Sequence, residues 1–136
     1  MVESLTSPVR ERAGFRCEYC HVPDSPHPWP FEIEHVIAQQ HGGPTNLGNL
    51  AYTCLQCNRH KGPNLAGIDR QTSRTKLVRL FNPRLHRWSY HFEWQGGAIL
   101  GRTPIGRVTV AVLALNQLVR VQMRAALIAE GLISEG

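Results

Sequence analysis

No hydrophobic run in this chain is long enough to cross a membrane, because a membrane-spanning helix needs about 20 apolar residues. The first seven residues also lack the basic start and apolar stretch of a secretory signal. These two absences predict a cytoplasmic protein with no membrane partner. Hydrophobic residues make up 42% of the 136 positions and aromatic residues only 7%, which suits a single domain with a modest core.

Cysteine is also scarce, but the four cysteines stand in two Cys-x2-Cys pairs, Cys17/Cys20 and Cys54/Cys57. The two-residue gap lets both sulfurs of a pair point at one Zn2+ at about 2.3 Å. Unrelated core thiols or two disulfides are the alternatives, yet neither gives a reason for the spacing to occur twice. A reducing cytoplasm further disfavours disulfides. The spacing therefore predicts one structural zinc site made by both pairs.

Basic residues gather over 59–87, just after the second cysteine pair, and acidic residues are nearly absent from that segment. This basic segment contains Arg59, Lys61, Arg70, Arg74, Lys76, Arg79, Arg84 and Arg87. The whole chain has a net charge of +5 and a pI near 9.4. Solvated surface charge is the simplest account of such a balance. Because the segment adjoins a metal site, however, its charge favours contact with the phosphates of a polyanion.

The first half of the chain predicts two strands followed by a helix. A short helix that begins at Ser7-Pro8 and ends at Gly14 leads into the first cysteine pair. Alternating β-branched and aromatic residues then predict a strand over 31–37 and a second short strand over 50–53. A helix over 54–61 follows and ends at Gly62-Pro63.

The second half predicts accessory strands and two C-terminal helices. Alternation of Trp88, Tyr90, Phe92 and Trp94 favours a half-buried strand over a base-stacking platform. A strand is also expected over 77–81, and a hairpin through 95–97 leads to a strand over 98–100. A helix is expected from Thr103-Pro104, with a strand as the alternative. The last helix is expected to be capped by Asn116 and to run to Ala129, with Arg120 and Arg124 on its polar face. Packing is the expected purpose of the last helix, and docking of a partner stays open.

Polar residues of types that can take part in catalysis lie between the two cysteine pairs. Glu34-His35 is followed by His41-Gly42-Gly43 and then by Asn49. If both cysteine pairs bind one metal ion, the residues that they bracket are drawn together. An acid, a histidine and an asparagine would then be neighbours, which indicates a candidate hydrolytic site.

With these residues, the chain resembles an HNH endonuclease of the zinc-knuckle kind over about residues 12–62. The matching motifs are Cys17-Glu18-Tyr19-Cys20, Glu34-His35, Gly42-Gly43, Asn49-Leu50 and Cys54-Leu55-Gln56-Cys57-Asn58-Arg59-His60-Lys61. The resemblance implies an α+β fold with a beta-beta-alpha-metal core and a four-cysteine zinc site. Accessory strands over about 77–101 and C-terminal helices over about 104–130 would complete a single domain over 1–136.

The resemblance also implies roles for individual residues. His35 would be the general base that takes a proton from water, and Asn49 would orient it, with Asn46 as a rival for that position. Glu34 and Asn58 would hold the catalytic ion, and their oxygen donors favour Mg2+ or Mn2+ over other divalent transition metals. The residues expected to contact substrate or phosphate are His41, Arg59, His60 and Lys61.

The expected activity is metal-dependent hydrolysis of DNA phosphodiester bonds. One ion and one base would nick one strand, so cutting both strands requires a homodimer or two binding events. An inactive zinc-dependent nucleic-acid-binding module is the main alternative, and a protein-interaction zinc domain is a third. Joint presence of Glu34, His35, Asn49 and Asn58 favours the nuclease, because a binding module does not need all four.

Overall fold

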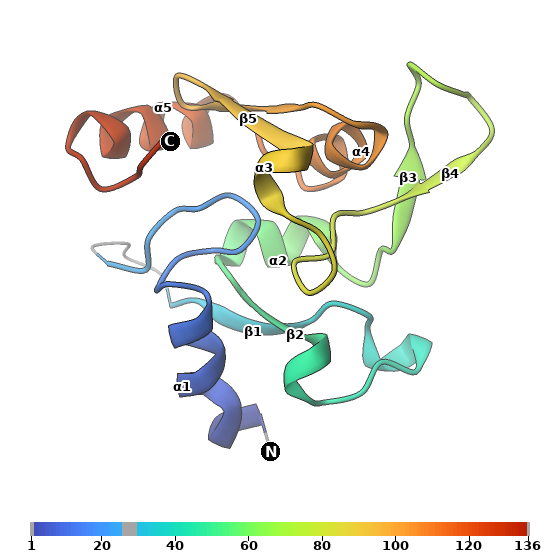
Figure 1. Cartoon of the computed structure of the whole chain (residues 1–136), viewed down its shortest axis with the longest axis vertical. Helices are drawn as coiled ribbons and strands as arrows, with labels where there is room; N and C mark the ends of the chain where they lie inside the picture. The colour runs from blue at the N-terminus through green and yellow to red at the C-terminus, as the bar shows by residue number, and fades with distance from the viewer. Residues whose placement is uncertain (1, 26–29, 136) are drawn as a thin grey trace. The chain divides into compact units, whose positions relative to one another are not determined.

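A computed structural model describes residues 2–25 and 30–135 of the chain. The chain divides into two compact units, which we call the N-terminal unit (residues 1–63 and 82–85) and the C-terminal unit (residues 64–81 and 86–136). Both contain helices and two-stranded antiparallel sheets, so the α+β prediction is confirmed (Figure 1). That the units form one domain stays a prediction.

The N-terminal unit has the strand–strand–helix order that the sequence predicts. Its elements are α1 (Val2–Arg12), β1 (Glu32–His35), the 3-10 turns η1 (Gln39–His41) and η2 (Leu47–Asn49), β2 (Leu50–Thr53) and α2 (Leu55–Lys61). β1 and β2 are antiparallel, with Glu34 opposite Ala51 and His35 opposite Leu50. β2 and the end of α2 lie where the sequence predicts them, whereas β1 is shorter at both ends than the expected strand.

The expected start of the first helix at Ser7-Pro8 is wrong, because α1 begins at Val2 and Pro8 lies inside it. The apolar stripe of α1 explains the difference. Val9 and Ala13 are buried against Leu50 and Tyr52 of β2, and Leu5 packs on the same cluster one turn earlier. Burial of this stripe outweighs the single hydrogen bond that proline removes on an exposed helix face.

The C-terminal unit contains two hairpins packed with helices. Its elements are β3 (Ala66–Ile68), β4 (Leu77–Arg79), α3 (Trp88–His91), β5 (Phe92–Gln95), β6 (Ala98–Gly101), α4 (Pro104–Val112) and α5 (Leu118–Ala129). β3 pairs with β4, β5 pairs with β6, and α4 contacts β3, β4 and β6. The helix predicted from Thr103-Pro104 is confirmed, since the Thr103 hydroxyl caps it by accepting the N–H of Gly106.

A strand that begins at Trp88 is wrong, because Trp88–His91 form the helical turn α3 and the strand begins at Phe92. In this arrangement the Trp88 ring lies 5.1 Å from that of Phe92 and 5.5 Å from that of Trp94. One helical turn brings residues four apart together, so the same spacing that resembles strand alternation also suits this ring cluster.

The expectation that Arg120 and Arg124 lie on a polar face of the last helix is wrong, because both are buried. Arg120 donates to the carbonyls of Leu113 and Ala114, and Arg124 donates to those of Gly97 and Leu115. Three of these carbonyls follow α4, where a helix end leaves acceptors without partners. Buried guanidinium groups therefore satisfy the α4–α5 connection.

Asn116 does not cap α5, whose N-cap is Gln117. The Asn116 side chain instead accepts the N–H of Ile99 through its amide oxygen, at 2.9 Å, and donates its amide N–H to the Ile99 carbonyl, at 2.8 Å. This amide thus extends the backbone pairing of β6. No helix in the described ranges has the length and apolar character needed to span a membrane.

Candidate active site

The four cysteines form one buried cluster in the N-terminal unit. Their sulfur atoms all lie within 4.8 Å of one another, and all four cysteines are free of disulfides. The sulfurs of Cys20 and Cys54 are 3.7 Å apart. Four sulfurs at about 2.3 Å from one tetrahedral Zn2+ are about 3.8 Å from each other, so the cluster fits this ion.

Local hydrogen bonds support the geometry of this cysteine cluster. Backbone N–H groups of Tyr19 and Cys57 point at the sulfurs of Cys17 and Cys54, each at 3.4 Å. Burial raises the pKa of the Cys17 and Cys57 thiols well above the usual value. Four buried thiolates would therefore need a bound cation to compensate their charge, and the cluster could hold zinc in this way.

Glu34 is directed into the interior of the N-terminal unit. One carboxylate oxygen forms a 2.8 Å ion pair with the ammonium of Lys61, and the other accepts a 2.9 Å hydrogen bond from the hydroxyl of Tyr19. Glu34 is 5% exposed and Lys61 is 1% exposed. The Lys61 ammonium also donates to the Val36 carbonyl at 2.9 Å. We call Tyr19, Glu34 and Lys61 the buried network.

The buried network bears directly on where a catalytic ion could bind. The carboxylate has the oxygen chemistry that a hard divalent ion prefers. In this structure, however, the ammonium of Lys61 neutralises it, so a divalent ion would have to displace Lys61 before it bound Glu34. Burial raises the pKa of the Glu34 carboxyl, against the opposing effects of Lys61 and of the Tyr19 hydrogen bond.

His35 lies at the end of β1 and faces the loop that follows. Its Nε2 is 2.7 Å from the hydroxyl of Thr45, which also accepts a 3.3 Å hydrogen bond from the Gln39 amide. Neighbouring residues of a strand point to opposite faces, so Glu34 and His35 contact different partners. The histidine is half-exposed and therefore open to a water molecule or a substrate.

Asn49 fastens this loop to β2. Its side-chain oxygen accepts the N–H of Ile37, and its amide nitrogen donates to the carbonyls of Ile37 and Pro44, each at 2.9 Å. The loop folds back closely enough that a Cβ on Gly43 would lie 1.7 Å from the Ile37 carbonyl oxygen. Gly42 has φ 88°, a conformation that side chains disfavour. The Gly-Gly pair and Asn49 together fix the segment that begins at His35.

Comparison with known families agrees with this geometry. A family model described as HNH endonuclease matches residues 17–64, which contain the cysteine cluster, β1, β2 and α2. Residues 17–64 are therefore similar to the HNH endonuclease family. The resemblance predicted from the sequence is thereby confirmed. No curated protein and no solved structure matches the chain.

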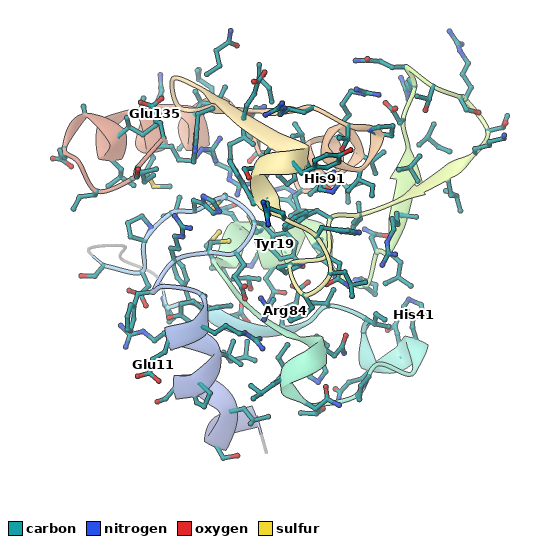
Figure 2. The ribbon with its side chains drawn as sticks, in the orientation of Figure 1. Glu11, Tyr19, His41, Arg84, His91 and Glu135 are labelled. Atoms are coloured by element: carbon teal, nitrogen blue, oxygen red, sulfur yellow. The ribbon has the colours of Figure 1, made fainter. Side chains whose placement is uncertain are left out.

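The remaining site residues of the HNH segment lie on α2 or on the loop. Asn58 is half-buried on α2, and its backbone carbonyl accepts the N–H of Gly62. Arg59 is exposed and His60 is half-exposed on the same helix. His41 lies on η1 at the surface of the N-terminal unit (Figure 2). Of the four expected substrate contacts, only Lys61 is fully buried, and its charge is used by Glu34.

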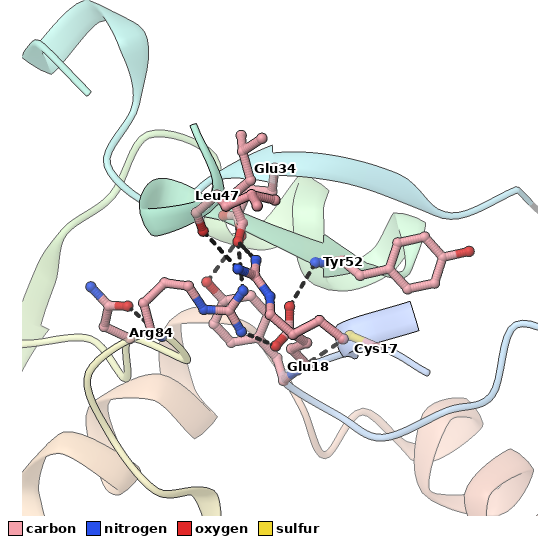
Figure 3. Close-up of polar contacts among 10 residues, drawn as sticks. Cys17, Glu18, Glu34, Leu47, Tyr52 and Arg84 are labelled. Atoms are coloured by element: carbon pink, nitrogen blue, oxygen red, sulfur yellow. Dashed lines mark hydrogen bonds and ion pairs between the residues drawn. The ribbon is translucent and has the colours of Figure 1, made fainter. Parts of the chain in front are cut away.

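Sequence reasoning missed three side chains of the HNH segment that contact these motifs: Glu18, Tyr19 and Thr45. Figure 3 shows Glu18 accepting the N–H of Tyr52 at 2.9 Å while its other oxygen pairs with Arg84. Position inside the first cysteine pair is the only sequence signal for Glu18 and Tyr19. Arg84, expected as part of a polyanion surface, is thus a structural residue of the N-terminal unit.

Replacement of Asn49 by alanine is expected to destabilise the N-terminal unit by about 1–3 kcal/mol, because the Ile37 and Pro44 backbone groups lose their partners. Urea denaturation at constant zinc measures this loss. Asn46→Ala is the matched control, since Asn46 is exposed and belongs to the same repeated Asn-Leu dipeptide. Equal midpoints for the two variants would contradict the bracing role of Asn49.

Proposed function

We propose that the chain is a metal-dependent HNH endonuclease that hydrolyses phosphodiester bonds of DNA, with His35 as its general base. The observation that supports this most directly is the contact of His35 Nε2 with Thr45, in a loop braced by Asn49. If Nε2 donates its proton to the Thr45 hydroxyl, Nδ1 is the basic nitrogen and is available to take a proton from water. The tautomer is part of the proposal.

The other residues act on binding and position. Asn49 keeps His35 at the end of β1, and the exposed Arg59 on α2 is suited to hold a phosphate next to the scissile one. We also propose structural Zn2+ at the four cysteines, and Mg2+ or Mn2+ at Glu34 and Asn58 once Lys61 has withdrawn. When bound, such an ion supplies charge stabilisation to the phosphoryl group. Thiolate ligands suit a reducing compartment, which favours the cytoplasm.

His35→Ala is expected to lower the rate of plasmid nicking by about 10²-fold or more, because general-base catalysis contributes at least that factor. Agarose-gel cleavage of supercoiled plasmid by zinc-loaded protein measures it, with added Mg2+, Mn2+ or Ni2+ or with EDTA. One base per chain predicts that nicked circles precede linear DNA, unless two subunits act together. Gln40→Ala, an exposed change beside His41, is the control that should keep the wild-type rate.

Wild-type turnover by His35→Ala would refute the assignment of the base. An inactive nucleic-acid-binding module is the alternative function. The ion pair of Lys61 with Glu34 favours it, because Lys61 neutralises the carboxylate that would bind the catalytic ion. The alternative predicts that plasmid stays intact with every metal although the protein binds DNA. Anisotropy of a labelled duplex, measured beside the cleavage assay, distinguishes the two.

A further inference from the structure

The cations of the basic segment differ in whether they form ion pairs within the described part of each unit. Lys61 and Arg84 are held by Glu34 and Glu18 in the N-terminal unit. Four of the others lie on the β3–β4 hairpin of the C-terminal unit, in its strands or its connecting loop, and all four are exposed: Arg70, Arg74, Lys76 and Arg79. We call them the hairpin cations. No ion pair engages them among the residues that the structure describes.

The acid of the hairpin does not offset this charge. Asp69 is 4% exposed, and the guanidinium of Arg107 on α4 donates to both of its carboxylate oxygens, at 3.1 and 2.9 Å. Asp69 also accepts hydrogen bonds from the Gln71 N–H and the Thr72 hydroxyl. This carboxylate is therefore neutralised and serves to fix the loop to α4, which leaves the hairpin cations as the net charge of the surface.

The hairpin has one packed face and one open face. A Cβ on Gly67 would lie 2.9 Å from Val108 and 3.0 Å from Val112 of α4, so the face that carries Gly67 is packed on that helix. Residues of a strand alternate between faces, and cross-strand partners share a face. Ile68 and its partner Leu77 therefore lie on the opposite face, where Leu77 is 73% exposed.

The open face combines the features of a nucleic-acid contact. Ile68, Arg70 and Arg74 line a hollow of about 400 Å³ beside this face, so two guanidinium groups border one recess. The exposed side chains of Ile68 and Leu77 beside the four hairpin cations suit a surface that meets both phosphates and the apolar edges of bases. The major groove of duplex DNA is wide enough to admit a two-stranded ribbon.

We propose that the β3–β4 hairpin is a second DNA-binding site, outside the HNH segment, in which the two-stranded ribbon enters a groove of duplex DNA. The hairpin cations contact phosphates on the two sides of the groove, and Leu77 contacts base edges. The site rests on the proposed function in taking DNA as its partner. It adds an element that anchors the duplex independently of His35 and of the cysteine cluster.

Salt dependence of binding tests the hairpin directly. Full-length zinc-loaded His35→Ala protein is titrated onto a short labelled DNA duplex at several KCl concentrations, so that the DNA stays intact. Arg70→Gln and Arg74→Gln are each expected to lower the slope of log K against log [salt] by about 0.9 and to weaken binding several-fold, because each removes one phosphate contact. Leu77→Ser is expected to weaken binding with an unchanged slope.

Arg102→Gln is the matched control, since Arg102 is an exposed arginine of the same unit that lies outside the hairpin. It should keep the wild-type slope. Unchanged affinity and slope in both hairpin arginine variants, when the protein with His35 intact still nicks DNA, would overturn the hairpin site and leave the proposed function intact. Tighter binding of single-stranded DNA or of RNA than of the duplex would also overturn it. Absence of both DNA binding and nicking in the wild-type protein would overturn both proposals.

Discussion

Removal of zinc from the cysteine cluster is expected to unfold the N-terminal unit. Structural zinc contributes about 10 kcal/mol or more of binding free energy, which becomes folding free energy where no site exists in the unfolded chain. The apolar cluster of this unit consists of Val9, Ala13, Leu50 and Tyr52 with a few half-buried neighbours. A core of that size does not replace the lost metal.

Chelation followed by far-UV circular dichroism and hydrogen exchange measures this effect. Amides of β2 and α2 should lose protection, since both elements join the cluster through Cys54 and Cys57. Amides of Ile99 and Val108 should keep more protection, because they belong to the separate core of the C-terminal unit. Cys57→Ser should reproduce the chelated state without a chelator. A spectrum that stays unchanged after complete zinc removal would contradict the structural role of the metal.

The elements that the sequence predicts well are those specified by local chemistry. Cys54 caps α2 by accepting the Cys57 N–H, and Gly62 ends the helix with φ 51°, so both boundaries follow from neighbouring residues. The Cys-x2-Cys spacing, which occurs twice, likewise predicts one cluster of metal ligands, whatever fold brings the two pairs together. Such features depend on a few residues that are close in the sequence, so they can be predicted without knowledge of the tertiary fold.

The predictions that are wrong depend on contacts between distant segments. Arg124 looks polar on a helical wheel, yet the Gly97 carbonyl that it satisfies belongs to the β5–β6 hairpin. The sequence also does not reveal that Lys61, which is expected to contact phosphate, forms an ion pair with a carboxylate on β1. A sequence does not distinguish a charged side chain that binds a buried polar group from one that faces solvent, because the partner is brought close only by the fold.

Lys61→Met is expected to destabilise the N-terminal unit by about 3–5 kcal/mol, because it leaves the Glu34 carboxylate buried without its cation. Methionine keeps most of the side-chain volume, so the loss reports the unpaired Glu34 charge and the lost hydrogen bond to the Val36 carbonyl rather than a cavity. The double variant Glu34→Gln/Lys61→Met removes both charges and should recover much of that stability. Urea denaturation of the two variants at constant zinc provides the comparison.

The loss caused by Lys61→Met should grow as pH rises. Burial already raises the pKa of the Glu34 carboxyl above its ordinary value near 4.5, and removal of Lys61 takes away the largest interactions that lower it, leaving only the Tyr19 hydrogen bond. A group whose pKa is raised in the folded state favours folding below its unfolded pKa, and this contribution disappears as pH rises through the folded pKa. The single variant should therefore approach the double variant at low pH and fall below it at neutral pH.

The same variant separates the two accounts of Glu34. If a divalent ion binds the carboxylate after Lys61 withdraws, Mn2+ or Mg2+ should stabilise Lys61→Met against urea and should leave the double variant unaffected, because a ligand stabilises only the state that binds it. Stabilisation confined to the single variant would support Glu34 as a ligand of the catalytic ion. Equal midpoints with and without the ion would instead assign Glu34 to the buried network alone, and any catalytic ion would then have to bind at other residues of the HNH segment.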